Sequence, residues 1–77
     1  MNNLSVALNG VKIACKILAI PEPKVYFMEH KVLPNPEITG MFLYDEYEII
    51  FNEDWVLNSE WIEVIVTCFH ESRHAYQ

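Results

Sequence analysis

The stretch that decides the fold is residues 70–77, HESRHAYQ, which contains the pattern His-Glu-x-x-His. On an α-helix, residues four apart lie one above the other, so His70 and His74 share a face and can hold one cation with neutral imidazole nitrogens. Glu71 is rotated too far to be the natural third ligand, but its carboxylate is close enough to take a proton from a metal-bound water. The spacing therefore predicts a zinc hydrolase.

Two strand-like segments, residues 40–44 (GMFLY) and 47–52 (YEIIFN), precede the motif. This order resembles the zincins, zinc metallopeptidases with His-Glu-x-x-His on the central active-site helix. Within them it is most similar to the small bacterial gluzincin-like group that includes the ImmA/IrrE-type peptidases of phages and mobile elements. The resemblance implies zinc held by His70 and His74, Glu71 as the general base, and a peptide or protein substrate. It also implies that an edge strand beside the helix binds the substrate as an added strand.

The third zinc ligand does not follow from the motif, because catalytic zinc sites use about three protein ligands and a water. In metzincin-like members the motif continues to a glycine and a third histidine, and here Gln77 occupies the glycine position. In gluzincin-like members the third ligand is a carboxylate on a later helix. We therefore expect residues 1–77 to be a single zincin-like domain that forms the N-terminal part of a longer catalytic domain. Alone, it should bind zinc weakly or lack it, and show little activity.

Other potential ligands lie elsewhere in the sequence. Glu63 shares the histidine face, but at a rise of 1.5 Å per residue it lies about 10 Å from His70 along the axis. Cys68 points nearly opposite to the histidines, and together with Cys15 it forms neither a CxxC pair nor a disulfide framework, so both should be buried thiols. His30, at a strand end, is typical of a surface residue. Acids that could reach the site from a neighbouring element are Asp45, Glu46, Glu48, Glu53 and Asp54.

Length and composition limit the class of protein. The 77 residues form one small domain, which buries only about 60% of its unfolded surface, so we expect a homo-oligomer or a missing C-terminal segment to cover exposed apolar surface. The net charge of −6 and five scattered Lys and Arg residues argue against nucleic-acid binding. The N-terminus lacks a basic signal region, and Lys12 and Lys16 interrupt the apolar run, which predicts a cytoplasmic protein without membrane attachment.

The expected fold class is α+β, with an N-terminal helix, three short strands in a small, mostly antiparallel sheet, and the C-terminal motif helix. Apolar residues at helical spacing predict a helix over 4–20 that ends before Pro21. Residues 24–29 should form a strand and 31–39 a loop. Residues 41–44 and 47–52 should form a hairpin around Asp45-Glu46. Residues 52–54 should turn the chain before Asn58 or Ser59 caps the last helix.

The same periodicities predict which faces are buried. In the hairpin, pairing Tyr44 with Tyr47 and Phe42 with Ile49 puts these residues and Phe51 on the face that packs on the helices. In the first helix the apolar stripe comprises Leu4, Leu8, Val11, Cys15 and Leu18, widened by Ala7, Ala14 and Ile17. In the last helix the packing stripe comprises Ile62, Ile65, Phe69 and Tyr76, and the cleft stripe comprises Glu63, Thr67, His70, His74 and Gln77.

Three alternatives to an active peptidase stay open at this point. Two histidines and a glutamate can fall at this spacing by chance on the surface of an amphipathic helix. A zincin-like domain can also keep its fold as a binding or regulatory module without catalysis. Finally, His70 and His74 from two chains could complete one tetrahedral structural zinc site.

Overall fold

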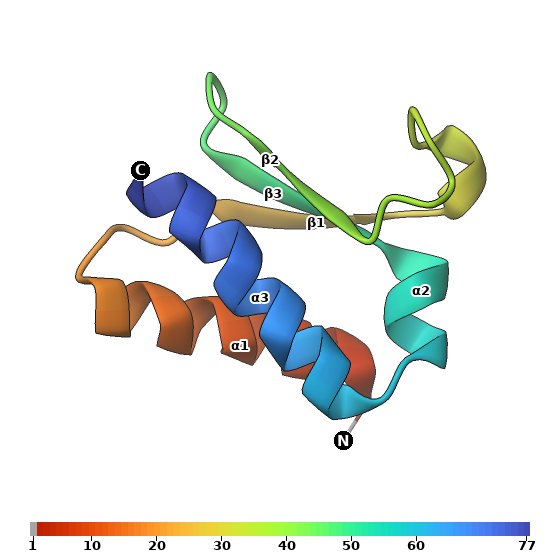
Figure 1. Ribbon diagram of the computed structural model, residues 1–77, viewed down its shortest axis with the longest axis horizontal. Helices are drawn as coiled ribbons and strands as arrows, with labels where there is room; N and C mark the ends of the chain where they lie inside the picture. The colour runs from red at the N-terminus through yellow and green to blue at the C-terminus, as the bar shows by residue number, and fades with distance from the viewer. Residues whose placement is uncertain (1) are drawn as a thin grey trace.

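The computed structural model describes residues 2–77 and confirms the α+β class (Figure 1). Both long helices lie on the same side of a three-stranded sheet, and the second crosses the first on its way to the edge of the sheet (Figure 1). The elements are α1 (Asn3–Leu18), β1 (Lys24–Met28), the 3₁₀ turn η1 (His30–Val32), β2 (Gly40–Leu43), β3 (Glu48–Asn52), α2 (Glu53–Asn58) and α3 (Trp61–Tyr76).

Helix α1 forms where the sequence predicts it, over Asn3–Leu18. The side chain of Asn2 caps its start by accepting a hydrogen bond from the backbone N–H of Ser5 at 2.9 Å. The helix ends at Ala19, which adopts a left-handed conformation with φ of 57° just before Pro21. Its buried face is narrower than the predicted stripe, because the larger side chains Leu8 and Ile17 are 48% and 68% exposed. The residues buried on α1 are Ala7, Gly10, Val11, Ala14 and Cys15.

The sheet is mixed, which corrects the expectation of a mostly antiparallel one. The strand order is β1-β3-β2, with β1 parallel and β2 antiparallel to β3. After η1, the loop over residues 33–39 leads to β2, which lies at the edge of the sheet opposite β1. Strand β3 then fills the central position between β1 and β2. The side chain of Asn52 holds this loop by donating to the carbonyl oxygens of Pro36 and Ile38 at 3.2 and 3.0 Å.

The hairpin of β2 and β3 has the predicted register, with Phe42 opposite Ile49. The turn between the strands comprises residues 44–47, two more than predicted. Its last residue, Tyr47, adopts a left-handed conformation with φ of 55°. The predicted inward face is confirmed for Ile49 and Phe51, which are fully buried in the central strand. Phe42 packs against the same core.

The segment before α3 forms the short helix α2, where the sequence predicted a turn. Asn52 caps α2 by accepting a hydrogen bond from Trp55 N–H at 3.1 Å. The predicted caps of α3 were wrong, because Asn58 and Ser59 donate back to carbonyl oxygens of α2 at 2.7 and 2.6 Å. The residue preceding α3 is Glu60, whose side chain makes no capping hydrogen bond.

Helix α3 buries a different face from the predicted one. Ile62 and Tyr76, expected to pack, are 51% and 60% exposed, so the helix is rotated about its axis relative to the prediction. The residues it buries are Val64, Cys68, Glu71 and Ser72. Small side chains at this contact let the two helices approach closely. The Cys68 Sγ of α3 donates a hydrogen bond to the Ala7 carbonyl oxygen of α1 at 3.3 Å.

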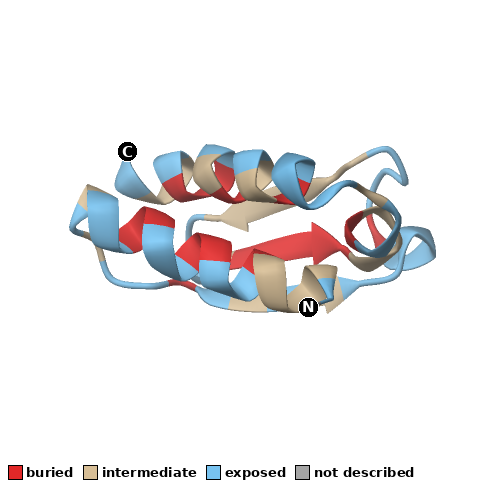
Figure 2. Cartoon of the chain, turned by 90° about the horizontal axis from the view of Figure 1, so that it is seen from below, coloured by how far each residue is buried: buried red, intermediate tan, exposed pale blue. Residues whose placement is uncertain are grey.

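The core lies where α1 and α3 face the central strand, and buried residues concentrate there in Figure 2. Both cysteines are free and buried in it, as predicted, and burial raises the pKa of the Cys68 thiol to about 12. Among residues 2–77, no helix has the length and apolar character required to cross a bilayer.

Candidate metal and catalytic site

The two histidines of the motif lie together near the C-terminal end of α3. The ring centroids of His70 and His74 are 4.9 Å apart and their planes are nearly perpendicular, at 88°. A zinc ion with Zn–N bonds of about 2.0–2.1 Å holds two nitrogens roughly 3.3 Å apart at a tetrahedral angle. The spacing of the rings is compatible with that separation. His70 is exposed and His74 is half-buried, so the pair is open to solvent.

Glu71 lies beside the pair but on the buried side of α3, with 5% of its surface exposed. Burial raises the pKa of its carboxyl above the ordinary value, while His70 and His74 partly oppose the shift. A carboxylate whose pKa moves towards neutrality is a better proton acceptor for general base catalysis. The Glu71 carboxyl thus lies buried next to two imidazoles, with its pKa above the ordinary value.

Gly40, the first residue of β2, makes room for Glu71. An ideal Cβ built on Gly40 would lie 3.4 Å from the Glu71 Cγ and 3.2 Å from Cδ1 of Phe51. Gly40 does not have a positive φ, so its missing side chain matters for space rather than for conformation. This role of Gly40 is not among the sequence-based predictions, although a glycine within a strand often marks the close approach of another element.

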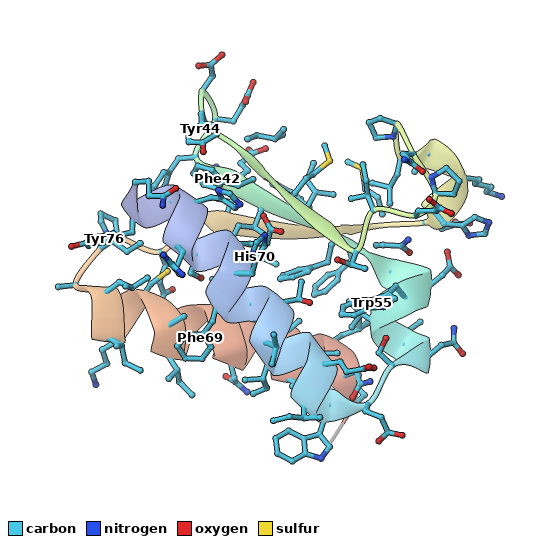
Figure 3. The ribbon with its side chains drawn as sticks, in the orientation of Figure 1. Phe42, Tyr44, Trp55, Phe69, His70 and Tyr76 are labelled. Atoms are coloured by element: carbon cyan, nitrogen blue, oxygen red, sulfur yellow. The ribbon has the colours of Figure 1, made fainter. Side chains whose placement is uncertain are left out.

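A hollow of about 320 Å³ lies between parts of the edge strand and the motif helix, and we call it the strand-side hollow. Figure 3 shows Phe42 and Tyr44 beside the C-terminal half of α3, and their rings meet edge to face with centroids 4.9 Å apart. Because β3 pairs with only one side of β2, the other side of β2 is an edge next to this hollow. The lining residues are Gly40, Met41, Phe42, Tyr44, His70, Glu71 and His74.

A second hollow, of about 220 Å³, lies against the same histidines and is lined by His70, Arg73, His74 and Gln77. We call it the arginine-side hollow. Its four residues follow the spacing i, i+3, i+4 and i+7, so they lie on one face of α3 and its C-cap residue. The histidine pair therefore lies between two hollows of different chemistry.

The other predicted candidates do not join the histidines. Glu63 lines a separate hollow with Trp55, Ile62, Val66 and Thr67, and Cys68 is buried against α1. His30 is hydrogen-bonded to Asp54, through both its backbone N–H at 2.9 Å and its ring Nδ1 at 2.8 Å. This pair lowers the pKa of the Asp54 carboxyl, mainly through the backbone hydrogen bond.

Within residues 2–77, no three His, Cys, Asp or Glu side chains are grouped so that they could hold a metal ion. The remaining acids, Asp45, Glu46, Glu48 and Glu53, therefore do not complete the site in this arrangement. As a donor set, the two imidazoles fit zinc as two of the about three protein ligands of a catalytic site.

Comparison with known proteins does not add a family to this description. No protein-family model, no curated protein and no solved structure matches the chain. The functional assignment therefore depends on the residues and geometry of this chain alone.

Proposed function

We propose that the chain is the motif-bearing part of a cytoplasmic, zincin-like zinc peptidase. The observation that supports this proposal best is the position of Glu71. Its carboxyl is nearly excluded from bulk solvent, lines the strand-side hollow, and lies next to two imidazoles one helical turn apart. Helix α3 buries this glutamate, while both histidines stay accessible to solvent.

In this proposal His70 and His74 hold the zinc ion through ring nitrogens. When bound there, zinc would supply Lewis-acid chemistry that polarises a carbonyl group and acidifies water. Glu71 takes a proton from the attacking water at a carboxylate oxygen, and its raised pKa suits that step. The third ligand is a side chain outside the described residues, borne by a further segment or by another molecule.

The substrate in this proposal is an extended peptide that pairs with the edge strand β2. Unpaired backbone groups of an edge strand can bind a peptide as an added strand. Such a peptide would pass along the strand-side hollow, where Met41, Phe42 and Tyr44 supply apolar surface next to Glu71. This arrangement would place a backbone carbonyl of the substrate near the histidine pair.

Cleavage of fluorescein-labelled, denatured casein by the protein as its gene encodes it tests this function. We expect cleavage that chelation abolishes and added zinc restores. Glu71→Gln should keep the zinc stoichiometry but lower the cleavage rate by about 10²-fold or more, since it removes the general base. The matched control is Glu63→Gln, which makes the same change on an exposed part of the same helix and should leave cleavage unchanged.

Two outcomes would contradict the proposal in different ways. Cleavage that survives Glu71→Gln would remove Glu71 as the base. Zinc binding without cleavage of casein would favour the second candidate, a structural site shared by two chains. The observation that favours this candidate is the open position of a histidine pair that lacks a third ligand among residues 2–77. It requires one zinc ion per two chains and a dimer that dissociates on chelation.

A further inference from the structure

The arginine-side hollow differs from the strand-side hollow in its charge. The strand-side hollow contains the carboxyl of Glu71 and three apolar residues, whereas the arginine-side hollow contains a guanidinium, an amide and no acidic side chain. This difference is notable in a chain with eleven acidic and only five basic residues. A ligand that spans both sides of the histidine pair would meet apolar surface on one side and hydrogen-bond donors on the other.

Arg73 is available to an external ligand. Its side chain is exposed, and the ion pairs formed within residues 2–77, His30 with Asp54 and Lys31 with Glu29, do not involve it. A guanidinium stays charged at all relevant pH values and presents its N–H groups in a planar fork that matches a carboxylate. Gln77, one helical turn further along, adds an amide N–H₂ group to the same hollow.

We propose that the arginine-side hollow binds the carboxylate of a peptide ligand. Arg73 donates two N–H groups to the carboxylate oxygens, and Gln77 donates a third from its amide. The carboxylate can belong to an Asp or Glu side chain or to the C-terminus of the ligand, and both have the same binding chemistry. This inference deepens the proposed peptidase function, since it assigns an acidic group to the substrate, but the binding itself requires neither zinc nor hydrolysis.

The test uses the metal-free chain, so that coordination of a carboxylate to zinc cannot contribute. Three peptides are titrated: acetyl-Ala-Ala-Ala with a free C-terminus, acetyl-Ala-Glu-Ala-amide, and acetyl-Ala-Ala-Ala-amide. Binding is followed by NMR through the Arg73 Nε–H and Gln77 side-chain amide signals. We expect at least one carboxylate peptide to shift both signals in a saturable way and the neutral peptide to shift neither. The two carboxylate peptides distinguish a C-terminal from a side-chain source.

Arg73→Gln should weaken binding of the carboxylate peptide by about 10-fold or more, because a charge-assisted, bidentate interaction is lost. Lys31→Gln is the matched control, since it makes the same change in net charge on η1, at the opposite end of the molecule from the last turn of α3 (Figure 1). It should leave the affinity unchanged. Binding by this control variant and by the Arg73 variant is read from the Gln77 amide signals.

Equal shifts from the neutral peptide, no shift from either carboxylate peptide, or unchanged affinity in Arg73→Gln would each overturn the inference. The casein assay separates this result from the proposed function. Carboxylate-selective binding without zinc-dependent cleavage would leave the binding site in place and remove the peptidase. Zinc-dependent cleavage without carboxylate selectivity would keep the peptidase and remove the binding site.

Discussion

Gly10 of α1 and Cys68 of α3 touch where the two long helices cross, and a Cβ built on Gly10 would lie 2.8 Å from the Cys68 Sγ. A glycine inside a helix normally lowers its stability by about 1 kcal/mol relative to alanine. Here the absence of a side chain lets α3 approach α1 closely enough for the Cys68 thiol to reach the Ala7 carbonyl oxygen. The close approach offsets the lower helix propensity of glycine.

Gly10→Ala should therefore destabilise the protein, although alanine is the better helix former. Overpacking a tight contact costs about 1–3 kcal/mol, which exceeds the gain in helix propensity. Urea unfolding followed by circular dichroism measures the difference. Adding Cys68→Ala to Gly10→Ala removes the clashing sulfur and should recover part of the lost free energy. A Gly10→Ala variant more stable than the wild type would contradict the close contact.

Gly40→Val should disturb the candidate site through Glu71. The added side chain would press on the Phe51 ring, 3.2 Å from the new Cβ, and on the Glu71 Cγ at 3.4 Å. We expect a loss of about 1–3 kcal/mol in the free energy of unfolding and a lower casein cleavage rate. Gly40→Ala, which adds one carbon, should lower both quantities less. Cleavage by Gly40→Val at the wild-type rate would show that the position of Glu71 does not depend on this glycine.

Glu71→Gln should increase stability at neutral pH. Burial raises the pKa of the Glu71 carboxyl in the folded protein above its unfolded value, so folding favours the protonated form. The contribution of Glu71 to the free energy of unfolding is therefore most favourable below its unfolded pKa, which is about 4.3. This contribution decreases as the pH rises from the unfolded pKa to the folded pKa. Glutamine carries no charge and avoids this loss. Denaturant unfolding at several pH values should show an advantage for Glu71→Gln at pH 7 that shrinks towards pH 4; a constant or reversed difference would contradict it.

Asn52→Ala should be among the more destabilising single changes outside the apolar core. The nearly buried amide donates to Pro36 and Ile38 carbonyl oxygens, and its oxygen caps α2 at Trp55 N–H. Losing a helix cap and two further hydrogen bonds that hold the 33–39 loop costs about 2–3 kcal/mol. The control is Asn58→Ala, whose exposed amide makes one hydrogen bond to the Asp54 carbonyl oxygen and should cost less than about 1 kcal/mol. Similar losses in the two variants, measured by urea unfolding, would contradict the role of Asn52.

Several features of the fold were predictable because they depend on local pattern. The first helix follows from apolar spacing and from Pro21, and the hairpin register follows from the alternation around Phe42 and Ile49. The grouping of His70, Glu71 and His74 follows from helix geometry alone, because the three residues lie within about one turn of one helix.

Features that depend on contacts distant in sequence were not predictable in this way. Hydrophobicity favoured Ile62 and Tyr76 for the packing face of α3, but the small residues Cys68 and Ser72 allow a closer contact with α1. The parallel pairing of β1 with β3 depends on the path of the 33–39 loop, which Asn52 holds from the end of β3. The space that Gly40 leaves for Glu71 likewise joins residues 31 positions apart.

The contact of α1 with α3 has a consequence for synthesis of the chain on the ribosome. Ala7 and Val11 are translated early, but Val64 and Cys68, which complete their environment, emerge only after almost every other element. A nascent chain that ends before α3 therefore presents an amphipathic helix and an open sheet face with nothing to bury them. Folding of this domain should therefore wait until α3 has emerged, and chaperones that hold apolar segments can bind the chain until then.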